Sequence, residues 1–153
     1  MATHPYIHFQ RGRCREAMTF YAEVLGGTDL QMMAYGEAHG APGEWSGSGH
    51  LMHAQMRVGD GHLMASDFPP GMEGDPQKAM SVMQTFPGID SARAAFDRLM
   101  DGGDVIQPFG PTFWSPGFGM LRDRFGTHWI LSAEPEAAAM GRDEAAEPEA
   151  HPT

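Results

Sequence analysis

The sequence predicts an α+β fold built from two copies of one strand–helix–strands unit. Residues 17–27 resemble residues 92–102 at a constant offset (92 − 17 = 75), and each segment has the spacing of a short amphipathic helix that ends in glycine. A strand-like run precedes each helix, further strand-like runs follow it, and each copy closes on a strand begun by Gly61 or Gly126. Two such units that share a core place a cleft where they meet.

The first half of the chain is divided by its glycines. In the predicted helix, apolar residues recur every three or four positions, and the pair Gly26-Gly27 ends it, because glycine adopts the left-handed cap without steric cost. The predicted elements are a strand at 6–9, a helix at about 15–25, a strand at 29–35, a loop or lid at 36–49, and a hairpin with strands at 50–58 and 62–68.

The faces of the hairpin follow from its alternation. The apolar residues Met52, Ala54, Met56 and Val58 are expected to face the helix layer, and the polar residues His53, Gln55 and Arg57 the opposite side of the sheet. A three-residue turn at 59–61 would pair Val58 with His62 and set His53 opposite Asp67. A two-residue turn would move His53 to the other face.

The second half repeats the order of the first. Its predicted elements are a strand at 80–86, a helix at 91–100, and strands at 105–107, 112–122 and 127–132, with a closing turn at 123–126. We therefore divide the chain into a first module at 1–69, a linker at 70–79 rich in proline and glycine, a second module at 80–133, and an acidic tail at 134–153 that is expected to be solvated and mostly disordered.

Composition excludes several classes of function. The formal net charge of −10 over 153 residues argues against a nucleic-acid surface, which needs clustered lysine and arginine. The single cysteine, Cys14, excludes an intrachain disulfide and a cysteine-based zinc cluster. No apolar run reaches the ~18 residues that a membrane span needs, and no secretory signal is apparent, so a cytoplasmic protein is expected.

Several short motifs together resemble a known family. They are Pro5-Tyr-Ile-His-Phe9, Ala17-Met-x-Phe-Tyr21, Gly26-Gly27, His53-Ala54, Leu63-Met-x-Ser-Asp67, Phe113-Trp-x-x-Gly-Phe-Gly119 and Asp123-x-Phe-Gly-x-x-Trp129. As a set, from about residue 5 to residue 133, they resemble the PhnB-like branch of the vicinal oxygen chelate superfamily, the glyoxalase/bleomycin-resistance/dioxygenase fold. The resemblance implies two βαβββ modules, whose eight strands form two sheets that curl around a cup, usually completed by a homodimer.

The resemblance also implies where a metal would bind. Metal-using members take ligands from the first and last strand of each module, which here fall near Tyr6, Ala65, Ser81 and Ile130. Alanine and isoleucine cannot bind a metal, and neutral serine and tyrosine are poor ligands, so no metal site and no cofactor are predicted. A displaced set, His53, Asp67 and His128, is the alternative. Members of this branch are often labelled as methyltransferases, but methyl transfer is not expected here. The glycine-rich segment Ser46-Gly-Ser-Gly49 does not join a strand to a helix, as a nucleotide-binding fingerprint requires.

The candidate catalytic residues are His53 and Asp67. If they pair, the carboxylate would orient the imidazole and raise its pKa, as suits a general base. The structural alternative is that Asp67 only caps the hairpin end. Leu63, Ala65 and Asp67 are expected on the cup side of one strand, and His128, Ile130 and Ser132 on that of another.

The ligand-binding residues expected around this pair are Gln55, Arg57, Trp114, Phe118 and His128, with Trp114 and Phe118 as a stacking wall for a flat ligand. A catalytic role for Cys14 is not expected, because no base partner is identifiable. Two functions remain open. One is an enzyme of the lyase or isomerase type that transfers a proton on a small oxygenated molecule, and the other is a non-catalytic binder that sequesters a small molecule.

Overall fold

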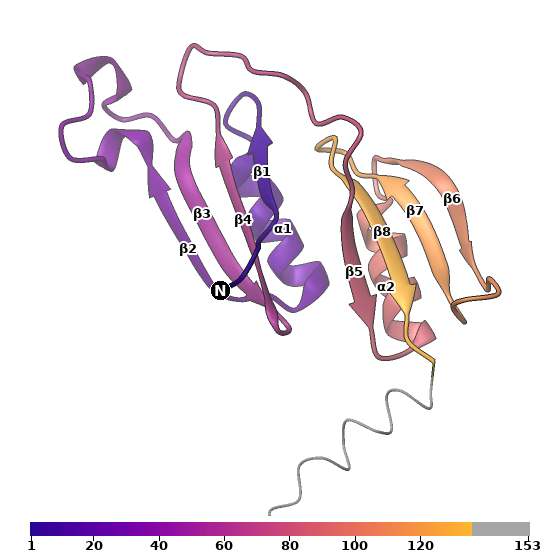
Figure 1. The fold of residues 1–153 in the computed structure, drawn as a ribbon. Coiled ribbons are helices and arrows are strands. Elements are labelled where there is room, and N and C mark those ends of the chain that lie inside the picture. Colours follow the sequence, from indigo (N-terminus) through magenta and orange to yellow (C-terminus); the bar gives the residue numbers. More distant parts are fainter. Residues whose placement is uncertain (136–153) are drawn as a thin grey trace, which may run out of the picture.

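The computed structural model describes residues 1–135, which form two four-stranded mixed sheets, each with one α-helix (Figure 1). The predicted fold class is confirmed. The elements are β1 (Tyr6–Phe9), α1 (Cys14–Leu25), β2 (Thr28–Ala34), β3 (Leu51–Val58), β4 (Gly61–Asp67), β5 (Val82–Phe86), α2 (Ile89–Leu99), β6 (Asp104–Gly110), β7 (Phe118–Arg122) and β8 (His128–Ala133). The predicted tail at 134–153 lies outside the described residues from 136 onward.

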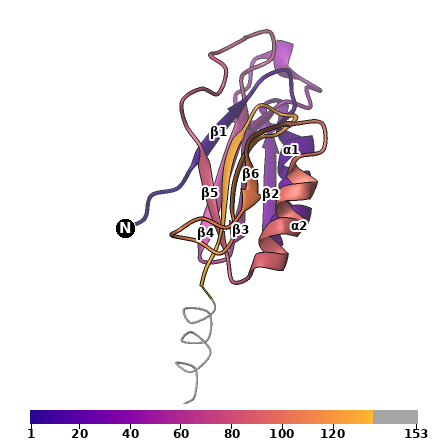
Figure 2. The ribbon, with the colours of Figure 1, turned by 90° about the vertical axis from the view of Figure 1, so that its right-hand side faces the viewer.

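The two sheets have the same topology. Their strand orders are β1-β4-β3-β2 and β5-β8-β7-β6, and in each the first strand pairs in parallel with the last strand of its module. The edge strands β1 and β5 face each other (Figure 1), and both helices lie on one side of the sheets (Figure 2). We call the side away from the helices the open face. It carries Tyr6, His53 and Gln55 in the first sheet and Met83, Phe118 and Ile130 in the second.

The two helices form because each has one small apolar stripe to bury. In α1 the fully buried residues Ala17, Met18 and Tyr21 recur at helical spacing, and Gly26 ends the helix in the left-handed conformation with φ of 67°. Both predictions are confirmed. In α2, Ala92, Ala95, Phe96 and Leu99 form the corresponding stripe.

The register of the β3–β4 hairpin differs from the prediction. Val58 pairs with Gly61, so the turn has two residues, and Gln55 lies opposite Met64 rather than Ala65. Because side chains alternate along a strand, this shift of one residue places His53 and Asp67 on opposite faces of the sheet. The expected pairing of His53 with Asp67 is therefore wrong.

Two predicted segments differ in detail. The loop at 36–49 is bounded and crossed by short 3-10 turns at Tyr35–Glu37 and Gly43–Trp45. The strand predicted at 112–122 is confined to β7. Its first part is a turn, because Thr112 N–H donates to the Ser115 carbonyl and Pro116 has no N–H to offer a neighbouring strand.

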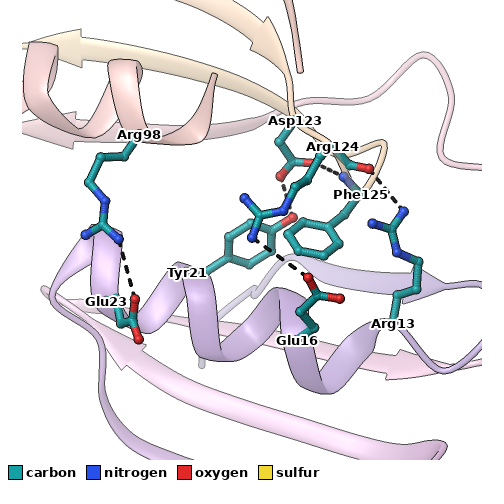
Figure 3. A network of polar contacts seen from close by, with 8 residues as sticks. All are labelled: Arg13, Glu16, Tyr21, Glu23, Arg98, Asp123, Arg124 and Phe125. Atoms are coloured by element: carbon teal, nitrogen blue, oxygen red, sulfur yellow. Dashed lines mark hydrogen bonds and ion pairs between the residues drawn. The ribbon is translucent and has the colours of Figure 1, made fainter. Parts of the chain in front are cut away.

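A buried carboxylate joins the two modules (Figure 3). Asp123, 3% exposed, follows β7 and accepts hydrogen bonds from the Tyr21 hydroxyl of α1 and from the Trp129 indole of β8. It also accepts from the backbone N–H groups of Phe125 and Thr127. The first helix and the last turn of the chain are thereby held in one core.

Near Asp123, arginine side chains of the second module contact aromatic rings and a carboxylate. The Arg124 guanidinium lies over the rings of Phe20 and Phe125, at 4.1 and 4.6 Å from their centroids, and the Arg98 guanidinium lies 3.4 Å from the Glu23 carboxylate. Figure 3 shows Arg98, Arg124 and Phe125 of the second module reaching toward α1 of the first.

Candidate functional site

The open face of the first sheet carries a chain of three hydrogen-bonded side chains. The Tyr6 hydroxyl lies 2.9 Å from His53 Nδ1, and His53 Nε2 lies 3.0 Å from Gln55 Oε1. Tyr6 is the first residue of β1, and His53 and Gln55 alternate along β3, so strand geometry alone sets both β3 side chains on this face. The rings of Tyr6 and His53 also lie 5.6 Å apart.

The hydrogen bonds of this chain assign its protons. An amide oxygen accepts only, so His53 Nε2 carries the hydrogen in its bond to Gln55 Oε1. In the neutral imidazole, Nδ1 then has the lone pair and accepts the Tyr6 hydroxyl proton. The result is a phenol that donates to a fixed imidazole and leaves its own oxygen lone pairs free to contact a ligand.

A second pair of polar side chains extends this surface. The His8 ring lies 5.2 Å from that of Tyr6 and stacks on Phe68 at 5.6 Å, and its Nδ1 lies 3.2 Å from the Ser66 hydroxyl. Aromatic, imidazole and hydroxyl groups thus follow one another along the edge of the sheet.

A groove of about 330 Å³ lies beside this edge. Tyr6 and His8 of β1 form one wall, and Ser81 and His128 of the second module line it as well. The predicted site residue His128 is thus near Tyr6. His53 does not line the groove, and it is one hydrogen bond behind Tyr6.

Asp67, predicted as a catalytic partner, lies instead in the core. Its side chain is 1% exposed, and it accepts hydrogen bonds from Cys14 N–H at 2.9 Å and Leu51 N–H at 2.7 Å. Burial raises its pKa, although the two backbone hydrogen bonds act in the opposite direction. Leu63, Ala65 and Asp67 all face the helix side, so their expected place in the cup is wrong.

The other predicted ligand-binding residues are spread over both sheets. Trp114, 53% exposed, meets Phe118 edge to face at 5.3 Å on the second sheet. Neither lines the groove beside Tyr6. Arg57 is exposed near the hairpin end, opposite Thr28 and His62.

The positions that the resemblance gives for a metal do not fit one. Ala65 is fully buried on the helix side, and Met64 is the residue beside Tyr6 on the open face. In the second sheet Met83 lies beside Ile130. Thioether and alkyl groups next to a neutral phenol are not the oxygen and nitrogen donors that hard or borderline divalent ions require.

The alternative metal set also fails on geometry. Asp67 lies under the first sheet, His53 above it, and His128 in the second sheet. Across residues 1–135, no three or more His, Cys, Asp or Glu side chains lie together in a way that could hold a metal ion.

Cys14 is fully buried at the start of α1, and burial raises the pKa of its thiol, with the Asp67 carboxylate adding to the effect. Such a thiol is a core residue rather than a nucleophile. Within the described residues, no helix has the length and apolar character to cross a membrane.

Sequence reasoning missed Tyr6 and His8 as site residues. Tyr6 was considered only as a weak metal ligand, although its position at the start of the first strand already placed it in the site. The sequence left the two-residue turn open only as an alternative, and it is this turn that sets His53 beside Tyr6.

Comparisons with known proteins agree with this architecture. The family model described as Glyoxalase/Bleomycin resistance protein/Dioxygenase superfamily matches residues 4–131. Protein YjdN of Escherichia coli is 27% identical over 141 residues, which are 86% of this chain and 95% of YjdN.

Two solved structures are similar over most of the chain. Protein PA1353 from Pseudomonas aeruginosa is 36% identical with a TM-score of 0.75, covering 87% of this chain and 98% of its own. A PhnB protein from Bacillus cereus, described as a putative 3-demethylubiquinone-9 3-methyltransferase, is 23% identical with a TM-score of 0.69, covering 88% and 100%. At that identity the second likeness shows the fold alone.

Proposed function

Because the chain belongs to the glyoxalase/bleomycin resistance protein/dioxygenase superfamily, we propose that it binds a small organic molecule beside β1 and transfers a proton on it through Tyr6 and His53. The observation that carries this proposal is the hydrogen bond from the Tyr6 hydroxyl to His53 Nδ1 at the edge of a groove large enough for a small molecule.

The proposed step needs only these side chains. The Tyr6 oxygen takes a proton from the ligand while its own proton passes to His53 Nδ1, which leaves an imidazolium whose Nε2–H stays bonded to Gln55. Return of the proton to another atom of the ligand gives isomerisation. In an elimination, the leaving group departs with the electron pair of its bond and then receives the proton. In these roles Tyr6 is the catalytic residue that touches the ligand, and Gln55 is a positioning residue.

Proton transfer can be tested without knowing the substrate. The test compounds are a panel of small hydroxyketones and 2-oxo acids, each incubated with the protein in deuterium oxide. NMR then measures how fast deuterium is incorporated at carbon. We expect His53→Gln and Tyr6→Phe to slow exchange at least ~100-fold, the lower range for a general base. The control is His62→Gln, which changes a histidine on the same sheet outside the Tyr6 chain. Equal exchange in His53→Gln and the wild type would rule the mechanism out.

The second candidate is a non-catalytic binder, favoured by the edge-to-face pair of the exposed Trp114 and the half-buried Phe118. Ligands of the panel that raise the melting temperature but show no exchange in any variant would support this function. Trp114→Ala would then weaken binding of flat ligands, whereas an unchanged affinity would contradict it.

We also propose that a second copy of this chain covers the open faces. Support comes from the single-sided helix layer and from large apolar side chains left exposed. Met83 of the open face is 56% exposed, Trp114, which meets Phe118 of that face, is 53% exposed, and its neighbour Phe113 is 98% exposed. Light scattering coupled to gel filtration is expected to give the mass of a dimer, and Phe113→Ser with Trp114→Ser to give a monomer. A monomeric wild type at micromolar concentration would contradict this proposal.

A further inference from the structure

A second cavity, of about 450 Å³, continues the groove beside Tyr6. The two cavities share His8, Pro76 and Gln77, so they are neighbouring parts of one groove between the modules. The charged side chains that line the second cavity are Arg11, Arg13, Glu73 and Arg122.

The charge along this groove is the reverse of the charge of the whole protein. The sequence has 20 aspartates and glutamates against 10 lysines and arginines. The joined groove is lined by the four basic residues Arg11, Arg13, Lys78 and Arg122, against the two acidic residues Glu73 and Asp75. His8 and His128 also line it. An acidic protein thus concentrates four of its ten permanent cations at one concave surface.

Arg13 is held in place by contacts that do not neutralise it. Its guanidinium lies over the Phe125 ring at 4.7 Å, and its Nη1 donates to the Arg124 carbonyl at 3.0 Å. No carboxylate of residues 1–135 lies within ion-pair distance of it. Arg13 lines the cavity and has further N–H donors besides the one used for the Arg124 carbonyl, and a guanidinium can bind two oxygens of a planar or tetrahedral anion.

The other two arginines have partners that an anion can replace. Arg11 lies 3.6 Å from Glu73, with 79% and 73% of the two side chains exposed, and Arg122 pairs with Asp104 on the surface. Exposed pairs of this kind contribute little to stability. Arg11 and Gly12 also both have positive φ, 57° and 72°, and Arg11 keeps this unfavourable backbone conformation at the mouth of the groove.

We propose that this groove binds a small organic anion, with a carboxylate or phosphoryl group held by Arg13 and supported by Arg11 and Arg122. The rest of the ligand extends past His8 toward Tyr6. Only this placement of the ligand depends on the proposed function, and the binding of the anionic group by the arginines does not. The proposal therefore names the ligand class for the site, an anionic molecule whose charged end and reacting end occupy the two parts of one groove.

The test uses the full chain and two simple probes, inorganic phosphate and malonate, titrated calorimetrically at low salt. Arg13→Lys keeps the charge but removes the fork, and it is expected to weaken binding at least ~10-fold, the range of one lost bidentate contact. Arg11→Gln with Arg122→Gln changes only exposed side chains, so it remains informative if Arg13→Lys unfolds. The control is Arg15→Gln, which changes an exposed arginine of α1 outside the groove and is expected to bind like the wild type.

The outcomes separate the ligand classes and the two proposals. Tighter binding of phosphate indicates a phosphoryl ligand, and tighter binding of malonate a carboxylate. His53→Gln is expected to bind both anions like the wild type, so loss of proton exchange with retained anion binding would leave this proposal intact. The proposal would be overturned if neither phosphate nor malonate bound to the wild type. It would also be overturned if removing the charge of Arg15 weakened binding as much as removing the charge of one groove arginine.

Discussion

Asp67 accepts hydrogen bonds from two buried backbone N–H groups, those of Cys14 at the start of α1 and Leu51 at the start of β3. A carboxylate from the end of β4 thereby caps a helix far away in sequence. His53, on the opposite face of the same sheet, instead contacts Tyr6 and Gln55. At the scale of residues, two side chains that a sequence pattern groups together can have separate roles, one in the core and one in the site.

Asp67→Ala is expected to destabilise the fold by roughly 2–4 kcal/mol, because two buried backbone donors lose their acceptor. The free energy of unfolding from urea titration measures the effect. Asp60→Ala, in the exposed turn of the same hairpin, is the control and is expected to change stability by less than about 0.5 kcal/mol. Similar values for the two variants would show that the Asp67 hydrogen bonds contribute no net stability.

Among the elements, the β3–β4 hairpin shows what sequence patterns can and cannot establish. Its strands were predicted, and Ala54 and Met56 are buried as expected. Met52 and Val58, expected on the same face, are only half-buried, and Leu51 is fully buried where the β2–β3 register shifts. The register of the hairpin was not predicted, because Gly59-Asp60-Gly61 permits both a two-residue and a three-residue turn. The difference of one residue decided which partner His53 has, and hence the composition of the candidate site.

The segment at 112–122 was overpredicted as a strand for a different reason. Its aromatic residues favour strands, but the Thr112–Ser115 turn satisfies the backbone locally. Helix α1 was predicted well, because both its periodicity and its glycine cap are local signals.

Gly26→Ala tests that cap. An alanine Cβ at this position meets no atom within 4 Å, so the expected cost of ~1 kcal/mol comes only from the left-handed φ of 67°. Gly110→Ala, which also has open space around it but no positive φ, is the matched control. The melting temperature of Gly26→Ala should be several degrees below that of Gly110→Ala. Equal melting temperatures would mean that a side chain at residue 26 does not strain the left-handed backbone.

For the whole molecule, the contact between Tyr21 and Asp123 is informative, because it joins buried polar side chains of the two modules that are 102 positions apart. Sequence analysis predicted a turn at 123–126 but assigned no role to Asp123, since its partners come from both modules. The repeat does not duplicate this contact: at the shared offset, the counterpart of Tyr21 (21 + 75 = 96) is Phe96, which has no hydroxyl. The two modules are thus similar in outline and joined by an asymmetric interaction.

The pKa of Tyr21 is raised well above its ordinary value of 10.0 by burial, and the nearby Asp123 carboxylate adds to the effect. Its contribution to stability is therefore fully present below pH 10 and is lost as the pH rises through the pKa of the folded state. Tyr21→Phe is expected to be less stable than the wild type at pH 7, by about 1–3 kcal/mol for a hydrogen bond to a buried charge.

The difference should shrink between pH 10 and 12, because phenylalanine does not ionise. Urea unfolding of the wild type and Tyr21→Phe at a series of pH values measures it. A difference that stays constant over this range would contradict the assignment of Tyr21 as the titrating group.

The sequence distance of that contact also bears on the order of events during synthesis. All strands of the first sheet have been synthesised once β4 is made, but Asp123, the carboxylate that accepts the Tyr21 hydroxyl, is added near the end of the described chain. Until then the first module has a phenol without its acceptor and an apolar helix surface that Phe125 and Trp129 later cover. A nascent chain stalled before Asp123 is thus expected to be a better chaperone substrate than the finished protein.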